Sequence, residues 1–85
     1  MPNAPEAEEI AAVLVEERLV DLPELSVDQP LVSSGLLDSI DLIRLIGKLE
    51  ELYDARVGDD DLRTENFETC RSISGMLARP GGIDR

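Results

Sequence analysis

A helical period of apolar residues in the middle of the chain constrains the fold more than any other feature. Between Ser39 and Asp54, apolar side chains recur every three or four residues. At 100° per residue this spacing puts them on one stripe of an α-helix, at Leu42, Leu45, Ile46, Leu49, Leu52 and Tyr53. Either Asp38 or Ser39 can cap the free amides of such a helix, and Asp41 adds negative charge to its first turn. The pattern predicts an amphipathic helix from Ser39 to about Asp54.

Two further segments have the same period. The first has Ala7, Ile10, Val13, Leu14 and Val20 on one side, opens with Asn3, Pro5 and Glu6, and is predicted to end near residues 18–20. The second has Cys70, Ile73, Met76 and Leu77 on one side, is capped by Thr69, and ends at Pro80-Gly81-Gly82. A short helical turn is expected before Thr69, anchored by Leu62 and Phe67.

The segment from Asp21 to Asp38 contains Pro23, Pro30 and Ser33-Ser34-Gly35, which disfavour a regular helix or strand. Apolar residues without a period can anchor this long loop beneath the helices: Leu22, Leu25, Val27, Leu31, Val32, Leu36 and Leu37. With no alternating strand pattern of useful length, the predicted fold is all-α. We expect a three- to four-helix bundle with a long loop between helices one and two, in one domain over residues 1–85, with a core of about 5–79 and a loose tail at 80–85.

Composition excludes several functions. Eight Lys and Arg against nineteen Asp and Glu give a net charge of −11, which opposes binding to nucleic acid and to anionic membranes. No run approaches the ~18 apolar residues of a membrane span, and the chain starts without a basic and apolar leader. Cys70 is the only cysteine, so no internal disulfide forms. We expect a cytoplasmic monomer in which Cys70 is buried and inert.

The chain contains no histidine, so neither a Ser-His-Asp nor a Cys-His arrangement can form, and no metal site is expected. Paired carboxylates such as Glu8-Glu9 and Glu16-Glu17 fall on polar faces, where nothing would shift their pKa values enough for acid or base catalysis. The chain is therefore not predicted to be an enzyme.

Ser39 admits two interpretations. It can be a plain helix cap, because serine is a preferred capping residue. Alternatively, a serine at the exposed start of a helix, with no internal base, can be a hydroxyl that a second protein modifies. The flanking Asp38 and Asp41 would then present a negative surface to that protein.

The stretch PLVSSGLLDSIDLIRLIGKLEELYD resembles the attachment loop and second helix of the phosphopantetheine-dependent carrier proteins, the acyl carrier protein family. Ile40 replaces the leucine of that family's Asp-Ser-Leu motif, and DDDLRTENFETCRSISGML is similar to its last two helices. The resemblance implies that a phosphopantetheinyl transferase attaches 4'-phosphopantetheine to Ser39, with Asp38 helping the transferase engage. The arm would then hold an acyl or aminoacyl group as a thioester.

The outward face of the predicted second helix is the expected partner surface. Helical spacing leaves Ile40, Ile43 and Gly47 outside the buried stripe. Acidic residues on this helix match the habit of the family, namely Asp41, Glu50 and Glu51. Arg44 and Lys48 depart from that habit, which favours partners of mixed charge over the enzymes of fatty acid synthesis.

We therefore expect a free-standing acyl or aminoacyl carrier of secondary metabolism. Its expected partners are the transferase, an adenylate-forming ligase or acyltransferase, and downstream synthases or condensing enzymes. One alternative is an acidic helical adaptor in which Ser39 is only a cap. Another, within the family, is a carrier for fatty acid synthesis.

Overall fold

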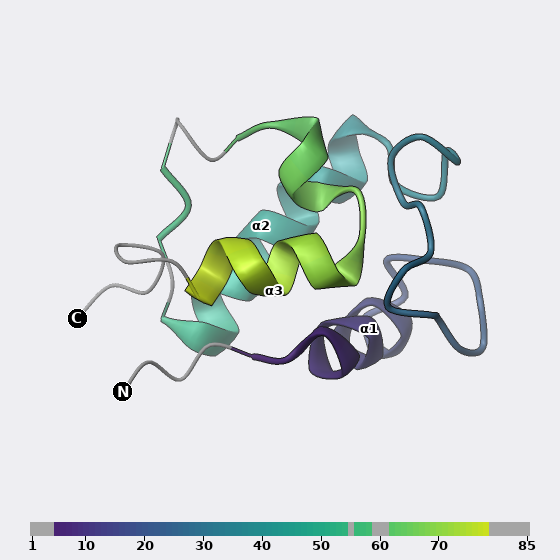
Figure 1. Cartoon of the computed structure of the whole chain (residues 1–85), viewed down its shortest axis with the longest axis horizontal. Coiled ribbons are helices and arrows are strands. Elements are labelled where there is room, and N and C mark those ends of the chain that lie inside the picture. The colour runs from purple at the N-terminus through teal and green to yellow at the C-terminus, as the bar shows by residue number, and fades with distance from the viewer. Residues whose placement is uncertain (1–4, 55, 59–61, 79–85) are drawn as a thin grey trace.

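The computed structural model describes residues 5–54, 56–58 and 62–78, and these residues form three helices and a helical turn (Figure 1). The elements are α1 (Ala7–Glu16), α2 (Ser39–Tyr53), the 3-10 turn η2 (Thr64–Phe67) and α3 (Cys70–Ala78). The predicted all-α class is confirmed, and no strand occurs within the described ranges. The proposed Asn3 cap, the Pro80 stop and the tail from residue 80 lie outside them.

An aliphatic core holds the three helices together. Its completely enclosed side chains come from all three helices, from η2 and from the loop before α2: Ile10, Leu14, Leu31, Leu45, Leu49, Phe67, Ile73, Leu77 and Cys70. Phe67 is the only phenylalanine of the chain and lies at the end of η2. Burial raises the pKa of the Cys70 thiol to about 11, so it stays protonated and inert near neutral pH, as expected.

The burial predicted for three leucines is wrong: Leu22 and Leu62 were expected to be anchors, and Leu52 was expected on the buried stripe of the second helix. Leu22 is 36% exposed, Leu52 49% and Leu62 51%. Leu52 lies at the edge of the apolar stripe in the last turn of α2, where the core no longer covers the helix. Leu22 and Leu62 lie in connecting segments, where no helical period fixes the direction of a side chain.

The end of α1 also differs from the prediction, because the helix ends at Glu16 instead of residues 18–20. Arg18 takes the left-handed conformation, with φ 58°. The amide of Leu19 then donates to the carbonyl of Leu14 across 2.9 Å, and the amide of Arg18 donates to that of Val15 across 3.1 Å. This is the Schellman arrangement, in which one left-handed residue ends a helix and directs the next apolar residue back to the core.

Polar contacts fix α1 to the C-terminal half of α2. The Tyr53 hydroxyl donates to Glu9 Oε2 across 2.8 Å, and Lys48 Nζ lies 3.4 Å from Glu17 Oε1. Burial, followed by the nearby Glu9 carboxylate, raises the pKa of Tyr53 to about 12, so this donor keeps its proton. Ser74 Oγ donates to the Pro5 carbonyl across 2.7 Å and so ties α3 to the residues before α1.

Replacing Leu49 by alanine should lower the free energy of unfolding by about 2–5 kcal/mol, because Leu49 is completely enclosed. The matched change Leu52→Ala, in the same helix, should lower it by only about 1 kcal/mol, since about half of that side chain is already in water. Urea unfolding followed by circular dichroism measures both. Equal losses would contradict the packing described for α2.

Candidate functional site

Asp38 is the N-cap of α2, and Ser39 is its first helical residue. Asp38 has an extended backbone, and its Oδ1 accepts a hydrogen bond from the Asp41 amide across 2.8 Å. Asp41 Oδ2 accepts one from the Asp38 amide across 3.3 Å, which completes a reciprocal capping box. The sequence allowed either Asp38 or Ser39 to cap, so the alternative in which Ser39 is only the cap is wrong.

The Ser39 hydroxyl is exposed and makes no hydrogen bond to any other residue within the described ranges. Two other serines nearby differ from it in this respect. The Ser33 hydroxyl donates to Glu68, and the Ser34 hydroxyl donates to the carbonyl of Pro30. Of these three serines, Ser39 therefore has the hydroxyl that an incoming reagent can reach without breaking an internal contact.

The loop before Ser39 turns at Gly35, whose φ of 85° lies in the left-handed region that favours glycine. The Gly35 amide donates to the Val32 carbonyl across 3.1 Å. Leu31 and Leu37, on either side of the turn, are buried, and the Leu37 amide donates to the Leu31 carbonyl across 2.9 Å. The chain is thus held in the core at Leu37 and reaches the surface at Asp38 and Ser39.

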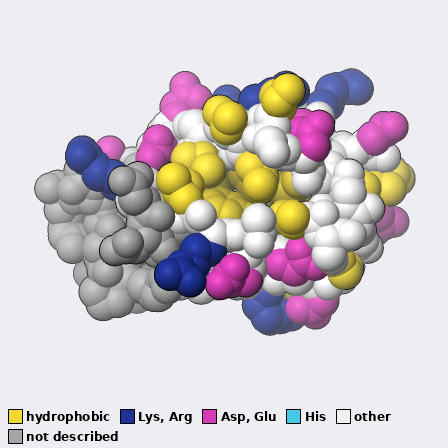
Figure 2. Space-filling view, turned by 90° about the horizontal axis from the view of Figure 1, so that it is seen from above, with side chains coloured by type: hydrophobic (Ala, Val, Ile, Leu, Met, Phe, Trp, Pro, Cys, Tyr) yellow, Lys and Arg dark blue, Asp and Glu magenta, His cyan; other side chains and the backbone are white. Residues whose placement is uncertain are grey.

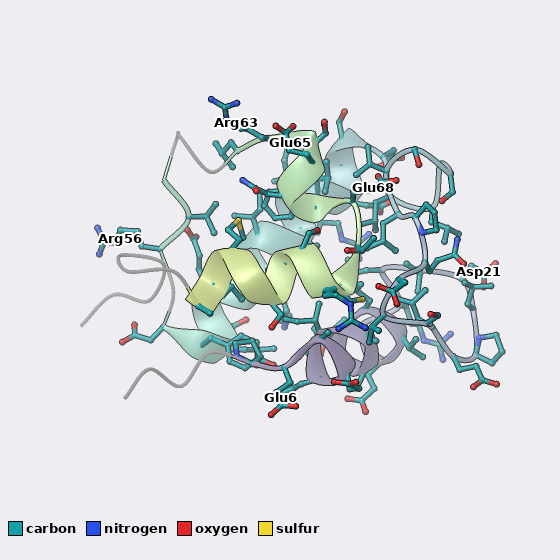
Figure 3. The ribbon with its side chains drawn as sticks, viewed as in Figure 1. Glu6, Asp21, Arg56, Arg63, Glu65 and Glu68 are labelled. Atoms are coloured by element: carbon teal, nitrogen blue, oxygen red, sulfur yellow. The ribbon has the colours of Figure 1, made fainter. Side chains whose placement is uncertain are left out.

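Glu68, between η2 and α3, lies beside this loop (Figure 3) and binds its backbone. Its Oε1 accepts hydrogen bonds from the amides of Val32 and Ser33 across 3.1 and 3.0 Å, and its Oε2 accepts one from the Ser33 hydroxyl. Its backbone carbonyl accepts the Leu31 amide across 2.7 Å. The hydrogen bonds from Ser33, which have the largest effect, and the one from Val32 hold the pKa of Glu68 below its ordinary value.

A second link joins the loop to α3. Arg71 Nε lies 2.9 Å from Asp28 Oδ1, and a guanidinium nitrogen lies 3.3 Å from Oδ2, so the pair is bidentate. The Arg71 amide also donates to the Val27 carbonyl across 3.2 Å. The hydrogen bond from Arg71 lowers the pKa of Asp28. Sequence analysis missed Glu68 and this pair, because their partners lie 35 to 43 positions away.

The apolar residues predicted for the partner face point outward. Ile40 is 67% exposed and Ile43 is 71% exposed, and Gly47 is exposed on the same side of the helix. Figure 2 looks down on the long side of the molecule that lies at the top of Figure 1, where η2 and the start of α2 are found. It shows apolar side chains gathered in the middle of this face and charged ones around them.

The charged residues of α2 differ in their exposure and in the contacts that they make within the fold. Glu50 is half-buried and accepts the Val57 amide across 3.1 Å. Lys48 Nζ lies 3.3 Å from Glu51 as well as beside Glu17. Arg44 is more open: its side chain is 60% exposed and reaches Asp41 only at 4.0 Å.

Among the described residues, no three Cys, Asp or Glu side chains lie close enough together to hold a metal ion. No described helix is both long and apolar enough to cross a membrane. The chain contains no histidine, the side chain that most often acts as a general base near neutral pH.

Replacing Asp38 by alanine should lower the free energy of unfolding by about 1 kcal/mol, because the Asp41 amide loses its acceptor. Replacing Ser39 by alanine should change it by less than about 0.5 kcal/mol, since the hydroxyl is exposed and makes no hydrogen bond to another described residue. Urea unfolding of the two variants tests this. If Ser39→Ala lowers the free energy of unfolding as much as Asp38→Ala does, Ser39 contributes to the helix cap and this description is contradicted.

Replacing Glu68 by glutamine should lower the melting temperature at pH 7, because the loop amides lose a charged acceptor. The folded-state pKa of Glu68 is depressed, so its contribution is complete above the ordinary value of 4.5 and disappears as the pH falls through the folded value. The difference in melting temperature from the wild type should therefore shrink below pH 4.5.

The matched control is Glu65→Gln, because Glu65 is exposed and pairs with an exposed Arg63 only across 3.8 Å. That change should leave the melting temperature nearly unaltered at both pH values. A Glu68→Gln difference that stays constant between pH 7 and pH 3 would contradict the role given to the carboxylate.

Comparison with known families adds to this geometry. Residues 8–79, most of the chain, match the family described as "phosphopantetheine attachment site". Neither the comparison with curated proteins nor that with solved structures gave a match. Members of this family are non-catalytic carriers that hold 4'-phosphopantetheine on a serine and serve a phosphopantetheinyl transferase and biosynthetic enzymes. The match and the all-α fold agree with the sequence resemblance, and the chain belongs to the phosphopantetheine-bearing carrier proteins.

Proposed function

We propose that Ser39 is the serine that receives the 4'-phosphopantetheine arm. The observation that carries the proposal is the division of roles at the start of α2. Asp38 accepts the helix amide, so the Ser39 hydroxyl stays exposed with no hydrogen bond to a described residue. The loop contacts of Glu68 and the buried Leu37 hold that hydroxyl at a fixed place on the surface.

The attachment step needs no base from this chain. Ser39 Oγ would attack the phosphorus of coenzyme A that bears the pantetheine, forming a new P–O bond to the serine. The P–O bond of the pyrophosphate would break, and adenosine 3',5'-bisphosphate would leave. The transferase would take the proton of the hydroxyl. Asp38 lies beside the reacting oxygen, exposed to the same solvent, where the transferase can contact it.

The loaded form would carry an acyl or aminoacyl group as a thioester on the terminal thiol of the arm. We propose a free-standing carrier for secondary metabolism that is loaded by an adenylate-forming ligase or an acyltransferase and serves downstream synthases or condensing enzymes. The support is Arg44, whose exposed positive charge stands four residues after Ile40 on the face that partners would meet. Enzymes that bind carriers through a basic surface would meet like charge there.

Incubation with coenzyme A, magnesium and a broad-specificity phosphopantetheinyl transferase should add the mass of one phosphopantetheine group to the intact wild-type protein. Ser39→Ala should gain nothing. Ser34→Ala, the matched control, should be modified like the wild type, because the Ser34 hydroxyl is engaged with the Pro30 carbonyl. Intact-protein mass spectrometry reads all three. A wild type that gains no mass, or a Ser39→Ala variant that gains one, would refute the assignment.

A further inference from the structure

The first residues of α2 are held by few contacts of the helix itself. Residues 39–44 include no buried residue. The buried residues that lie nearest to Ser39 along the chain are Leu37, in the loop before the helix, and Leu45, on the helix. From Ser39 to Leu45 the helix rises about 9 Å, so Leu37 is the closer anchor. The position of the Ser39 hydroxyl therefore depends on the loop as well as on the helix.

The end of this loop, residues 30–37, is closed by hydrogen bonds of its own, and we call it the 30–37 turn. The Leu37 amide donates to the Leu31 carbonyl across 2.9 Å, and the Gly35 amide donates to the Val32 carbonyl across 3.1 Å. Leu31 and Leu37 are both buried. Because these two leucines are bonded to each other, a contact that holds Leu31 also holds Leu37 and the start of α2.

Glu68 binds the 30–37 turn with its backbone and with its side chain. Its backbone carbonyl accepts the Leu31 amide across 2.7 Å. Its Oε1 accepts the amides of Val32 and Ser33 across 3.1 and 3.0 Å, and its Oε2 accepts the Ser33 hydroxyl. A continuous set of hydrogen bonds thus leads from Glu68 through Leu31 to the end of the turn, where α2 begins.

Asp28 and Arg71 form a second link between the loop and α3, and this link attaches a different part of the loop. The two side chains form a bidentate pair, and the Arg71 amide donates to the Val27 carbonyl across 3.2 Å. Both side chains are more than 60% exposed. Asp28 comes before the 30–37 turn, so this pair holds the loop at a point further from Ser39 along the chain. It provides a matched comparison for Glu68.

We infer that Glu68 is a positioning residue for the attachment reaction: through the 30–37 turn it holds the Ser39 hydroxyl where the phosphorus of coenzyme A can meet it in line. The inference rests on the proposed attachment at Ser39. In phosphoryl transfer the attacking and leaving oxygens lie roughly in line, and a misplacement of about 1 Å can cost about a hundred-fold in rate. The Glu68 carboxylate binds the loop and takes no part in the transfer itself.

The test compares Glu68→Ala, which removes the carboxylate from the turn, with Asp28→Ala, which removes the other link. Glu68→Gln is the intermediate variant, because one amide oxygen can replace Oε1 as the acceptor while the NH2 group cannot replace Oε2. Circular dichroism first checks that each variant is folded at the assay temperature. If Glu68→Ala does not fold, Glu68→Gln takes its place in the comparison.

Each variant is modified in single-turnover reactions with saturating coenzyme A, magnesium and an excess of a broad-specificity phosphopantetheinyl transferase. Intact-protein mass spectrometry follows the reaction at several transferase concentrations. The limiting rate reports the transfer step, and the half-saturating transferase concentration reports binding. These two quantities separate the position of the hydroxyl from the docking of the transferase.

Glu68→Ala should lower the limiting rate about ten-fold or more and leave the half-saturating concentration within about two-fold, because the hydroxyl is displaced and the docking surface is not. Glu68→Gln should lower the limiting rate less. Asp28→Ala should leave both quantities within about two-fold of the wild type. A loss of stability alone would reduce the fraction of folded protein and would leave the limiting rate of the folded fraction unchanged.

Amide hydrogen exchange measured by NMR gives a second readout that needs no transferase. In Glu68→Ala the amides of Leu37 and Asp41 should exchange several-fold faster relative to the Leu49 amide, because the turn and the start of α2 open locally while the core of the helix stays closed. In Asp28→Ala this ratio should match the wild type.

Wild-type limiting rates in both Glu68 variants would overturn the inference and leave the attachment at Ser39 standing. Equal losses for Glu68→Ala and Asp28→Ala would show that any link to α3 serves, which also overturns it. A raised half-saturating concentration with an unchanged limiting rate would make the 30–37 turn a docking element, and the positioning role would be wrong. A wild type that gains no phosphopantetheine would instead refute the attachment, and the inference with it.

Discussion

The capping box between Asp38 and Asp41 is the interaction on which the site depends. It satisfies the amides of Asp38 and Asp41 with the side chains on either side of Ser39, so that Ser39 enters the helix without using its own hydroxyl. A serine at the N-cap itself would have its oxygen directed to the helix amides. With the cap one residue earlier, at Asp38, the start of the helix does not use the Ser39 hydroxyl, which we propose to be the nucleophile.

The rest of the fold keeps that starting point in place. The loop that leads to Asp38 is held by buried Leu31 and Leu37 and by two carboxylates, Asp28 of the loop and Glu68 beyond it. Glu68 accepts hydrogen bonds from the Val32 and Ser33 amides, before the turn at Gly35. Asp28 pairs with Arg71 of α3. In a chain of net charge −11, several acids thus have defined partners in the fold instead of serving only as a solvated surface.

Features of the fold that depend on neighbouring residues could be predicted from the sequence, and features that depend on distant residues could not. The limits of α2, the Thr69 cap of α3 and the η2 turn could be predicted, since a local period and local capping residues determine them. Thr69 Oγ1 accepts the Ser72 amide across 3.0 Å, as its position predicts. The exposed isoleucines also follow from the period of α2.

Other features depend on contacts that sequence spacing does not encode. The end of α1 depends on a left-handed Arg18, a residue type with no preference for that conformation. The role of Glu68 depends on a loop that folds back from more than thirty residues away. Arg44 and Lys48 have the same charge on the same helix, and the contact of Lys48 with Glu17, just after the end of α1, could not be read from their spacing.

We propose that this fold holds the hydroxyl of Ser39 free for another protein to modify. Fragmentation mass spectrometry of the wild-type chain, after treatment with coenzyme A and a transferase, tests it most directly, because the fragments locate the added group along the sequence. The account predicts a single phosphopantetheine on Ser39, with Ser33 and Ser34 unmodified. A group found on Ser33 or Ser34, or spread over several serines, would contradict it.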